Sequence, residues 1–377
     1  MNDYTTYVGM DVHARSIMCK GMCKETGELY TKLFADSPSS TEVHEWMATL
    51  PQPVYSAYES GCTGFWLARE LRELGDDCDV IAISTLPRSA KDKQGKCDKL
   101  DAKVILREIM NPLSDCSTVW LPDVETEAAR DLARARQDAV KAVKSAKQKV
   151  SSLLLRYHFV WNEKTPAGKL KKAWRGDYRK WLDKIALPDP GAQAALEHYK
   201  RAVKRAEEEL AEMDGLVRAE AEKPRWKPYV DALVHLKGVD VCGAFLACAE
   251  FGDFSRFASG RKVSCWVGTV PTNSSSGPKE SHGGITKAGS THLRMGLVEG
   301  CCGIDRWRAA DKAVKGHPAS AEVLAIAGKA NERLRKRYRH LRDDLGKTPN
   351  KARVAVVSEL ARWIWVVGLQ VQAEQAA

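Results

Sequence analysis

The sequence predicts an α/β domain at the N-terminus, followed by regions that are mostly α-helical. Three observations support this fold class. Strand-like and helix-like segments alternate over residues 5–110, apolar residues recur at helical spacing from residue 126, and the C-terminal third contains further apolar helical segments. The chain has 377 residues, of which 44% are hydrophobic, so two or three domains with substantial cores are expected.

The N-terminal domain is expected to begin with three strands and then to alternate helices with strands. In chain order, we expect strands at 4–12, 16–23 and 29–34, a helix at 38–50, a strand at 54–58, a helix at 63–74, a strand at 79–83 and a helix at 98–110. Ser37 or Ser39 can cap the first helix, Gly75 ends the second and Asn111 with Pro112 ends the third. This is the element order of a ribonuclease-H-like domain.

Four carboxylates occur where such a sheet would bring them together. Asp11 and Glu59 each end an apolar strand-like run, and Asp98 and Asp101 share one face at the start of the third helix. Oxygen-rich sites hold Mg²⁺, and a metal pair can bind the attacking and leaving oxygens of a phosphodiester. Four converging carboxylates also repel one another unless a divalent cation is present, so we expect all four to be Mg²⁺ ligands. The alternatives are ordinary surface charge and, for the helical pair, attraction to the helix dipole.

The middle of the chain is expected to form two long helices. Apolar residues recur at steps of three and four over residues 126–156 and again over 196–217, which is typical of a coiled-coil seam. The sequence allows an antiparallel hairpin within one chain and a pairing between two chains. Pro224 and Pro228 mark the next boundary, so the expected domains are 1–124, 125–224 and 225–377.

The link between these helices, residues 156–190, interleaves basic residues with tryptophan, tyrosine and phenylalanine. Basic side chains neutralise phosphates and aromatic faces stack on bases, which favours contact with nucleic acid. The alternative is a solvated basic face whose aromatic rings are buried against the helices. The candidate contacts in this segment are Lys171, Lys172, Trp174 and Arg175.

The C-terminal third is expected to be helical apart from one loop-like stretch at 271–278. The expected helical segments are 232–251 with a break at 236–240, 291–302, 319–338 and 351–371. The loop contains the run Ser274-Ser275-Ser276 before Gly277, and composition alone makes it a linker. A serine nucleophile also needs an activating group, and no histidine stands at an informative spacing.

Composition narrows the partners. The net charge of +10 suits a polyanion. The 11 cysteines lack Cys-x-x-Cys spacing, which disfavours a zinc ribbon and favours reduced thiols in the cytosol. The polar N-terminus shows no signal peptide, and no apolar run of bilayer length is expected, so we expect a cytoplasmic protein without a membrane partner.

Beyond these patterns, the chain resembles the transposases of the IS110 family over nearly its whole length. The resembling segments are residues 8–13, 58–61, 96–102, 266–271, 275–277 and 285–290, followed by Leu293 and Arg294. One departure is Lys237-Gly238-Val239-Asp240, where the family usually has Pro-Gly-Ile-Gly. Asp240 weakens the interpretation of that turn as a phosphate-binding motif.

The resemblance implies a RuvC-like N-terminal domain whose four carboxylates bind Mg²⁺, and a C-terminal transposase domain. A serine of the latter would attack the scissile phosphate and form a covalent protein–DNA link. We carry this role to Ser276, because the family's serine directly precedes glycine, with Ser275 as the rival. Bound metals can lower the pKa of the serine and so replace a histidine base.

The resemblance also implies a bridge RNA, encoded by the element, that pairs with donor and target DNA while the protein reads RNA shape. Dimers that pair into tetramers are implied as well, with the serine of one protomer reaching a neighbour's carboxylates. The setting would be the bacterial cytoplasm, associated with the nucleoid. Lys287 and Arg294 would steady the phosphate or contact the DNA backbone, and Lys96 is a further candidate contact.

Two other functions remain open from the residues alone. A hydrolytic, RuvC-like nuclease would use the same carboxylates with water as the nucleophile. A basic coiled-coil scaffold would bind RNA or DNA without catalysis and without dependence on Mg²⁺.

Overall fold

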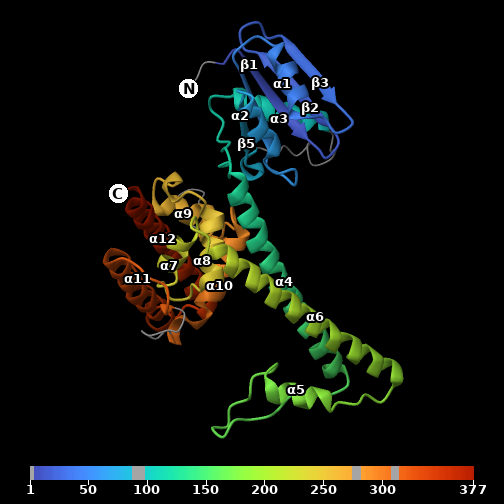
Figure 1. The fold of residues 1–377 in the computed structure, drawn as a ribbon, viewed down its shortest axis with the longest axis vertical. Coiled ribbons are helices and arrows are strands. Elements are labelled where there is room, and N and C mark those ends of the chain that lie inside the picture. The colour runs from blue at the N-terminus through green and yellow to red at the C-terminus, as the bar shows by residue number, and fades with distance from the viewer. Residues whose placement is uncertain (1–3, 87–97, 274–281, 307–313) are drawn as a thin grey trace. The chain divides into compact units, whose positions relative to one another are not determined.

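The computed structural model describes residues 4–86, 98–273, 282–306 and 314–377 (Figure 1). Contacts within the chain divide it into two units, Met1–Asp123 and Val124–Ala377. The division into three domains at 1–124, 125–224 and 225–377 stays a prediction.

The N-terminal unit is a mixed five-stranded sheet with the strand order β3-β2-β1-β4-β5. Its strands are β1 (Thr6–Val12), β2 (Ile17–Cys23), β3 (Leu29–Phe34), β4 (Val54–Glu59) and β5 (Asp77–Ile81). The first three pair antiparallel, whereas β4 pairs in parallel with both β1 and β5. The sequence prediction of an α/β N-terminal domain is therefore confirmed.

Helices cover both faces of this sheet. They are α1 (Ser40–Ala48), α2 (Trp66–Glu73) and α3 (Asp98–Met110), with a short 3₁₀ turn at Ile83–Thr85. Apolar residues of α1 and α2 form one core with Val8, Met10 and Tyr58, while Ile105 of α3 packs on Ala57 from the other face. Ser39 caps α1 with a capping box, as one of the two expected caps.

Two long helices, α4 (Val124–Arg156) and α6 (Pro190–Ala221), pack along each other within one chain (Figure 1). The two helices run antiparallel: Arg136 of α4 pairs with Asp214 of α6, and Lys147, later in α4, pairs with Glu207, earlier in α6. This is the antiparallel hairpin among the two arrangements that the sequence allowed. Coiled-coil packing in the strict sense stays a prediction. The short helix α5 (Gly176–Asp183) packs against the end of the pair through a shared apolar cluster.

The rest of the second unit is mostly helical and surrounds one apolar core. Its elements are α7 (Lys227–Leu233), α8 (Val241–Phe251), a 3₁₀ turn (Phe254–Arg256), α9 (Gly260–Val267), β6 (Pro271–Asn273), β7 (His282–Ile285), α10 (Thr291–Gly300), a 3₁₀ turn (Cys301–Arg306), α11 (Ala321–Arg339), a π-helical turn (His340–Asp344) and α12 (Pro349–Ala376). The expected helices are present. The fully loop-like reading of 271–278 is wrong at its start, because β6 pairs antiparallel with β7. Pro271 fits there because the first residue of an edge strand need not donate a hydrogen bond.

Helix α12 is long and apolar enough to cross a membrane by length and composition, so the expectation that no apolar run has this length is wrong. In the second unit, however, 56% of its most apolar window is buried. Val357, Leu360 and Ile364 are completely buried in the C-terminal core. This burial is typical of a central core helix.

Candidate active site

Asp11 and Glu59 stand at the carboxyl ends of two neighbouring strands. β1 and β4 pair in parallel, and their register, continued by one residue, places the two acids at the same level. Side chains alternate along a strand, so Asp11 lies on the face of Gly9, and Glu59 lies on the face of Ala57. Both Gly9 and Ala57 pack against α3. The two carboxylates therefore share the face of the sheet that α3 covers.

Gly9 lets α3 approach β1 at backbone contact distance. A Cβ atom on Gly9 would lie 2.4 Å from the carbonyl oxygen of Ala102 and 2.5 Å from the backbone nitrogen of Leu106. A side chain of any other residue would force the helix away. Because Asp101 directly precedes Ala102, this contact fixes the first turns of α3 against the strand that carries Asp11.

The surroundings of the four acids differ. Asp11 is 5% exposed, and its Oδ2 lies 3.0 Å from Nε2 of His13. Glu59 is half-buried and Asp101 is exposed, whereas the side chain of Asp98 lies outside the described part of the chain. Among the side chains that the structure describes, no three Asp, Glu, His or Cys residues form a group able to hold a metal ion. Convergence of all four carboxylates stays a prediction.

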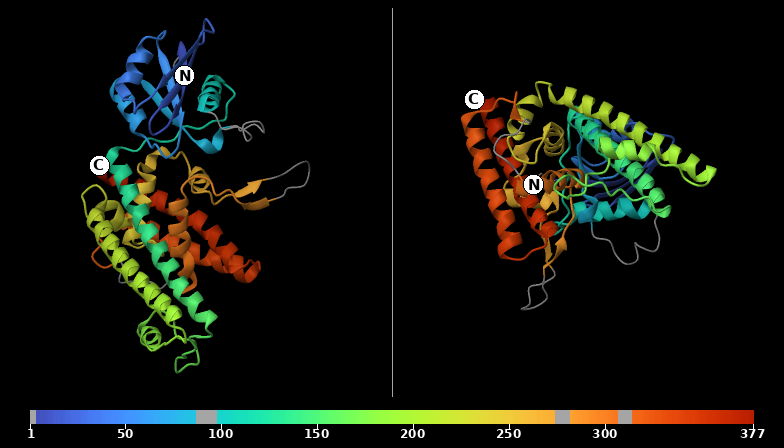
Figure 2. Two further views of the ribbon diagram at one scale, coloured as in Figure 1. Left: turned by 90° about the vertical axis from the view of Figure 1, so that its right-hand side faces the viewer. Right: turned by 90° about the horizontal axis from the view of Figure 1, so that it is seen from below.

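The serine candidates belong to a different unit. β6 and β7 form a two-stranded sheet that projects from the helices of the C-terminal unit (Figure 2). Residues 274–281 connect the two strands and include Ser275 and Ser276. Both serines lie outside the described residues, as does Lys96 of the N-terminal unit. The strands that flank the serine segment are described, and so is the base on which they stand.

The base of the β6–β7 hairpin, where its two strands join the helices, is held by close backbone contacts between the segments around Gly268 and Gly289. Gly268 and Gly289 both have positive φ, at 70° and 61°. A Cβ atom on Gly289 would lie 1.7 Å from the carbonyl oxygen of Trp266, so only glycine fits. The backbone nitrogen of Lys287 donates to the carbonyl oxygen of Gly268 at 3.0 Å. Lys287 itself is exposed, and its contact with nucleic acid stays a prediction.

Arg294 of α10 holds the same base from within. It is 9% exposed, and its Nη1 donates to the carbonyl oxygens of Val267 at 2.8 Å and Ala288 at 2.9 Å. Its Nη2 donates to Oγ1 of Thr291 at 3.0 Å. Burial lowers the pKa of this guanidinium. This geometry favours a positioning role for Arg294 over the expected contact with phosphate.

A buried carboxylate, Glu250, ties the long helix α4 to the start of α10. Nε and Nη2 of Arg134 donate to its two oxygens at 2.8 and 3.2 Å, and Oγ of Ser290 donates to Oε2 at 3.0 Å. Oγ of Ser290 also accepts from the backbone nitrogen of Leu293 and so caps α10. Burial opposes the charge of Arg134, but the hydrogen bond to Glu250 and the negative charges of Glu250, Asp131 and Glu127 together outweigh burial and raise the pKa of the guanidinium.

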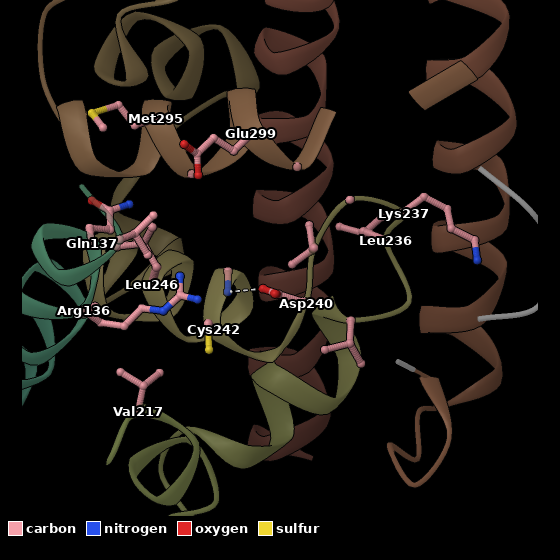
Figure 3. Close-up of a pocket in the computed structure, with 18 of the residues that line it drawn as sticks. Arg136, Gln137, Val217, Leu236, Lys237, Asp240, Cys242, Leu246, Met295 and Glu299 are labelled. Carbon is pink, nitrogen blue, oxygen red and sulfur yellow. Dashed lines mark hydrogen bonds between the residues drawn. The ribbon is translucent and has the colours of Figure 1, made fainter. Parts of the chain in front are cut away.

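The contacts of Glu250 with Arg134 and Ser290 form one clasp between α4 and α10, and Gln137 with His292 forms a second clasp between the same helices. Nε2 of Gln137 donates to the carbonyl oxygen of His292 at 2.9 Å, and its Oε1 lies 2.7 Å from Nδ1 of the same histidine. A cavity of about 450 Å³ opens beside this contact, with Gln137 facing Met295 and Glu299 of α10 (Figure 3). Asp240, the departure from the family pattern, lines the same cavity and caps α8 by accepting from the backbone nitrogen of Gly243 at 2.7 Å.

In the segment between α4 and α6, the aromatic rings pack on one another. The ring centroid of Tyr178 lies 5.0 Å from that of Trp174 and 5.4 Å from that of Trp161. Nζ of Lys147 lies 5.4 Å from the Trp174 centroid, and Lys171 pairs with an aspartate. Tyr178 is buried and Trp161 and Trp174 are half-buried in this cluster, as the second alternative expected, and base stacking by Trp174 stays a prediction. Lys172 and Arg175 are exposed and remain candidate contacts.

Sequence reasoning missed two features that position these groups. One is Gly9, whose signal was a glycine inside an apolar strand-like run. The other is Glu250, the single acid within the otherwise apolar helix 241–251. An acid in such a run indicates a buried charge that requires a partner.

Two protein families and several transposases are similar to this chain. The family described as "Transposase IS116/IS110/IS902 family" matches residues 230–314, and the DEDD-type transposase family of IS110 elements matches residues 8–159. A putative transposase of Sinorhizobium fredii, y4qE, is 34% identical over 319 residues, which cover 83% of this chain and 75% of the relative. The transposase of insertion sequence element IS1533 from Leptospira borgpetersenii is 28% identical over 89% of this chain and 96% of its own length. A probable family 20 transposase of Pseudomonas aeruginosa is 26% identical, with 76% and 84% covered.

Proposed function

The chain belongs to the IS110 family of transposases and is a DNA transposase. On that premise we propose that it recombines DNA under the guidance of an RNA. The proposed reaction depends on Mg²⁺ and proceeds through a covalent serine–DNA intermediate. The observation that carries the proposal is the placement of Asp11 and Glu59 at one level of the sheet, on the face covered by α3. Asp98 and Asp101 begin that helix, whose backbone touches β1 at Gly9.

The donor set fits a hard divalent cation. Each of the four proposed ligands offers carboxylate oxygens, which Mg²⁺ prefers over nitrogen or sulfur. Asp11 is buried, and a buried carboxylate needs a cation or hydrogen-bond donors for stability. When bound there, Mg²⁺ would polarise the scissile phosphate and favour ionisation of an approaching hydroxyl group. The carboxylates would orient the phosphate by fixing the metal positions.

In the proposed reaction, Oγ of Ser276 forms a bond to the scissile phosphorus. The bond from phosphorus to one deoxyribose oxygen breaks, and the proton lost by the serine is balanced by one gained at the leaving oxygen. A hydroxyl end of the exchanged strand then attacks the serine phosphoester, which releases the serine and rejoins the DNA. The proposed roles of Arg294 and of the Glu250 clasp are to hold the segment with Ser275 and Ser276 in place.

The proposed partners are donor DNA, target DNA and a bridge RNA. The net charge of +10 and the exposed Lys172 and Arg175 beside the long helices support binding to polyanions. We assign the reaction to the bacterial cytoplasm at the nucleoid and to a dimer or tetramer, in which the serine of one protomer reaches the carboxylates of another. The coiled-coil pairing of α4 and α6 is part of this proposal.

The central experiment uses purified protein, donor and target DNA and RNA transcribed from the sequence that flanks the gene. Wild-type protein should leave a DNA strand attached to protein after denaturation, and Ser276→Ala should abolish the adduct. Asp11→Asn should abolish it too, while retaining affinity for RNA. Normal recombination by both Ser276→Ala and Ser275→Ala would rule out the serine step.

Controls separate the alternatives. A hydrolytic nuclease would yield free ends and no adduct under the same conditions. Omission of the RNA should abolish recombination, and a guide with altered loops should redirect it. Chelation of Mg²⁺ should stop strand cleavage, whereas cleavage without metal would contradict the proposed role of the four carboxylates.

A further inference from the structure

A groove of about 1050 Å³ lies between the base of the β6–β7 hairpin and helices α11 and α12. Val270 and Ile285 of the hairpin line one side, and Val354 and Trp363 of α12 line the other. Gly284 of β7 also faces it, and a Cβ atom there would meet nothing within 4 Å. The groove therefore offers open apolar surface at the foot of the strands that flank the serine segment.

Basic side chains line the same groove. Among the described residues that line the groove, the basic ones are Arg333, Arg337, Lys351 and Arg362, and the one acid is Glu359. These basic residues come from two helices, α11 and α12. The groove therefore carries a net positive charge, since four cations face a single carboxylate.

Glu359 forms ion pairs with two of these cations, Arg333 and Arg337. Its side chain is 11% exposed and pairs with Nε of Arg333 and, at 3.3 Å, with Nε of Arg337. The side chains of these arginines are still 62% and 44% exposed. One buried carboxylate thus fixes two guanidinium groups that line the groove and leaves much of their surface available to an anion. Arg362 is fixed as well, because its Nε donates to Oγ of Ser264 at 2.7 Å.

We propose that this groove binds single-stranded DNA next to the scissile phosphate. Fixed cations match the phosphates, and the indole of Trp363 with the aliphatic floor matches the faces of unstacked bases. A duplex hides its base faces and gains little from an apolar floor. An apolar protein segment would cover the floor but would leave the cations without counter-charge. The choice of the strand beside the cleavage point rests on the proposed function, since β6 and β7 lead into the segment with Ser275 and Ser276.

The test measures equilibrium binding of a fluorescent single-stranded DNA to the full-length protein in EDTA, where no cleavage occurs. Trp363→Leu keeps the floor apolar and should weaken binding about tenfold, while Trp363→Phe should restore most of the affinity. Arg337→Gln should weaken binding and make the negative slope of log affinity against log salt less steep by roughly 0.7. Arg335→Gln is the matched control, because this arginine lies on the same helix, has the same charge and does not line the groove. It should retain a larger share of the affinity than Arg337→Gln.

Each other outcome overturns the proposal. Wild-type affinity in both Trp363→Leu and Arg337→Gln, with thermal unfolding unchanged, shows that the groove does not bind the strand. Equal losses for duplex DNA, or a loss confined to an RNA of the same sequence, assign the groove to another nucleic acid. A changed sedimentation coefficient of Trp363→Leu without DNA assigns it to a contact between copies. This assay measures binding without cleavage. If the covalent serine mechanism fails, the binding result therefore still decides whether the groove holds single-stranded DNA.

Discussion

The two units of this transposase position their proposed functional groups by different means. In the N-terminal unit, Asp11 and Glu59 take their positions from the parallel register of β1 and β4 and from one glycine that admits α3. In the C-terminal unit, the hairpin that flanks the serine segment stands on a base held by buried polar side chains, chiefly Glu250 and Arg294. Backbone pairing tolerates most side-chain changes, whereas a side-chain network depends on each of its members.

The comparison predicts that the N-terminal site is most sensitive to added volume at Gly9. Gly9→Ala places a methyl group 2.4 Å from the carbonyl oxygen of Ala102, so α3 and Asp101 must shift away from β1. A displacement on the order of 1 Å costs about a hundredfold in rate, and strand cleavage should fall by at least that factor. The measurement is the rate of formation of the protein–DNA adduct.

Gly21→Ala is the matched control for this variant. Gly21 also lies within a strand of the same sheet, but a Cβ atom there has its closest neighbour, a side-chain methyl of Val8, at 3.4 Å. This variant should keep nearly all of its activity. Equal loss in both variants would show that the sheet, and not the approach of α3, limits the reaction.

The same difference explains what the sequence predicts well. Alternating apolar runs predict the strands of the first unit, and because parallel strands carry their carboxyl ends to one edge, the acids Asp11 and Glu59 could be placed from sequence. The helices of the second unit also follow from periodicity. The pairing of Arg134 with Glu250 could not be foreseen, because it joins residues 116 positions apart through side chains alone. Composition could not show that Trp174 packs on Tyr178, and contact of its remaining exposed surface with nucleic acid stays a prediction.

In the C-terminal unit, loss of one polar partner should have a large effect on stability. Glu250→Gln keeps the size of the side chain but removes the carboxylate that pairs with Arg134, which then has only the more weakly acting Asp131 and Glu127 near it among the described residues. Removal of one partner from a buried charged hydrogen-bond pair costs about 2 kcal/mol in the free energy of unfolding, which chemical denaturation can measure. Glu332→Gln is the control, because this exposed acid pairs with Lys336 of the same helix, and its loss should leave stability unchanged. A stable Glu250→Gln protein with full activity would contradict the importance of the clasp.

Arg294 allows the two roles of a cation to be separated. Arg294→Lys keeps the charge but cannot reach Val267, Ala288 and Thr291 together. If Arg294 positions the hairpin, this variant should unfold about 1 kcal/mol more easily and react more slowly while its DNA affinity stays constant. If the guanidinium contacts phosphate instead, the variant should lose affinity with unchanged stability. Lys287→Gln provides the reference, since this side chain is exposed and its loss should act on affinity alone.

The smallest effect concerns pH and the second clasp. Burial, together with the nearby positive charge of Arg134, lowers the pKa of His292, which also faces Glu250, Lys141 and Asp138. The folded state therefore binds a proton less readily than the unfolded state, whose histidine titrates near its ordinary pKa of about 6.5. His292 thus contributes stability above that pH, and the contribution is lost as the pH falls through the lowered pKa of the folded protein. His292→Asn keeps a donor for Oε1 of Gln137 and removes the titration, so its melting temperature should decline less than that of wild type between neutral and mildly acidic pH. Parallel pH profiles for the two proteins would show that this clasp does not titrate.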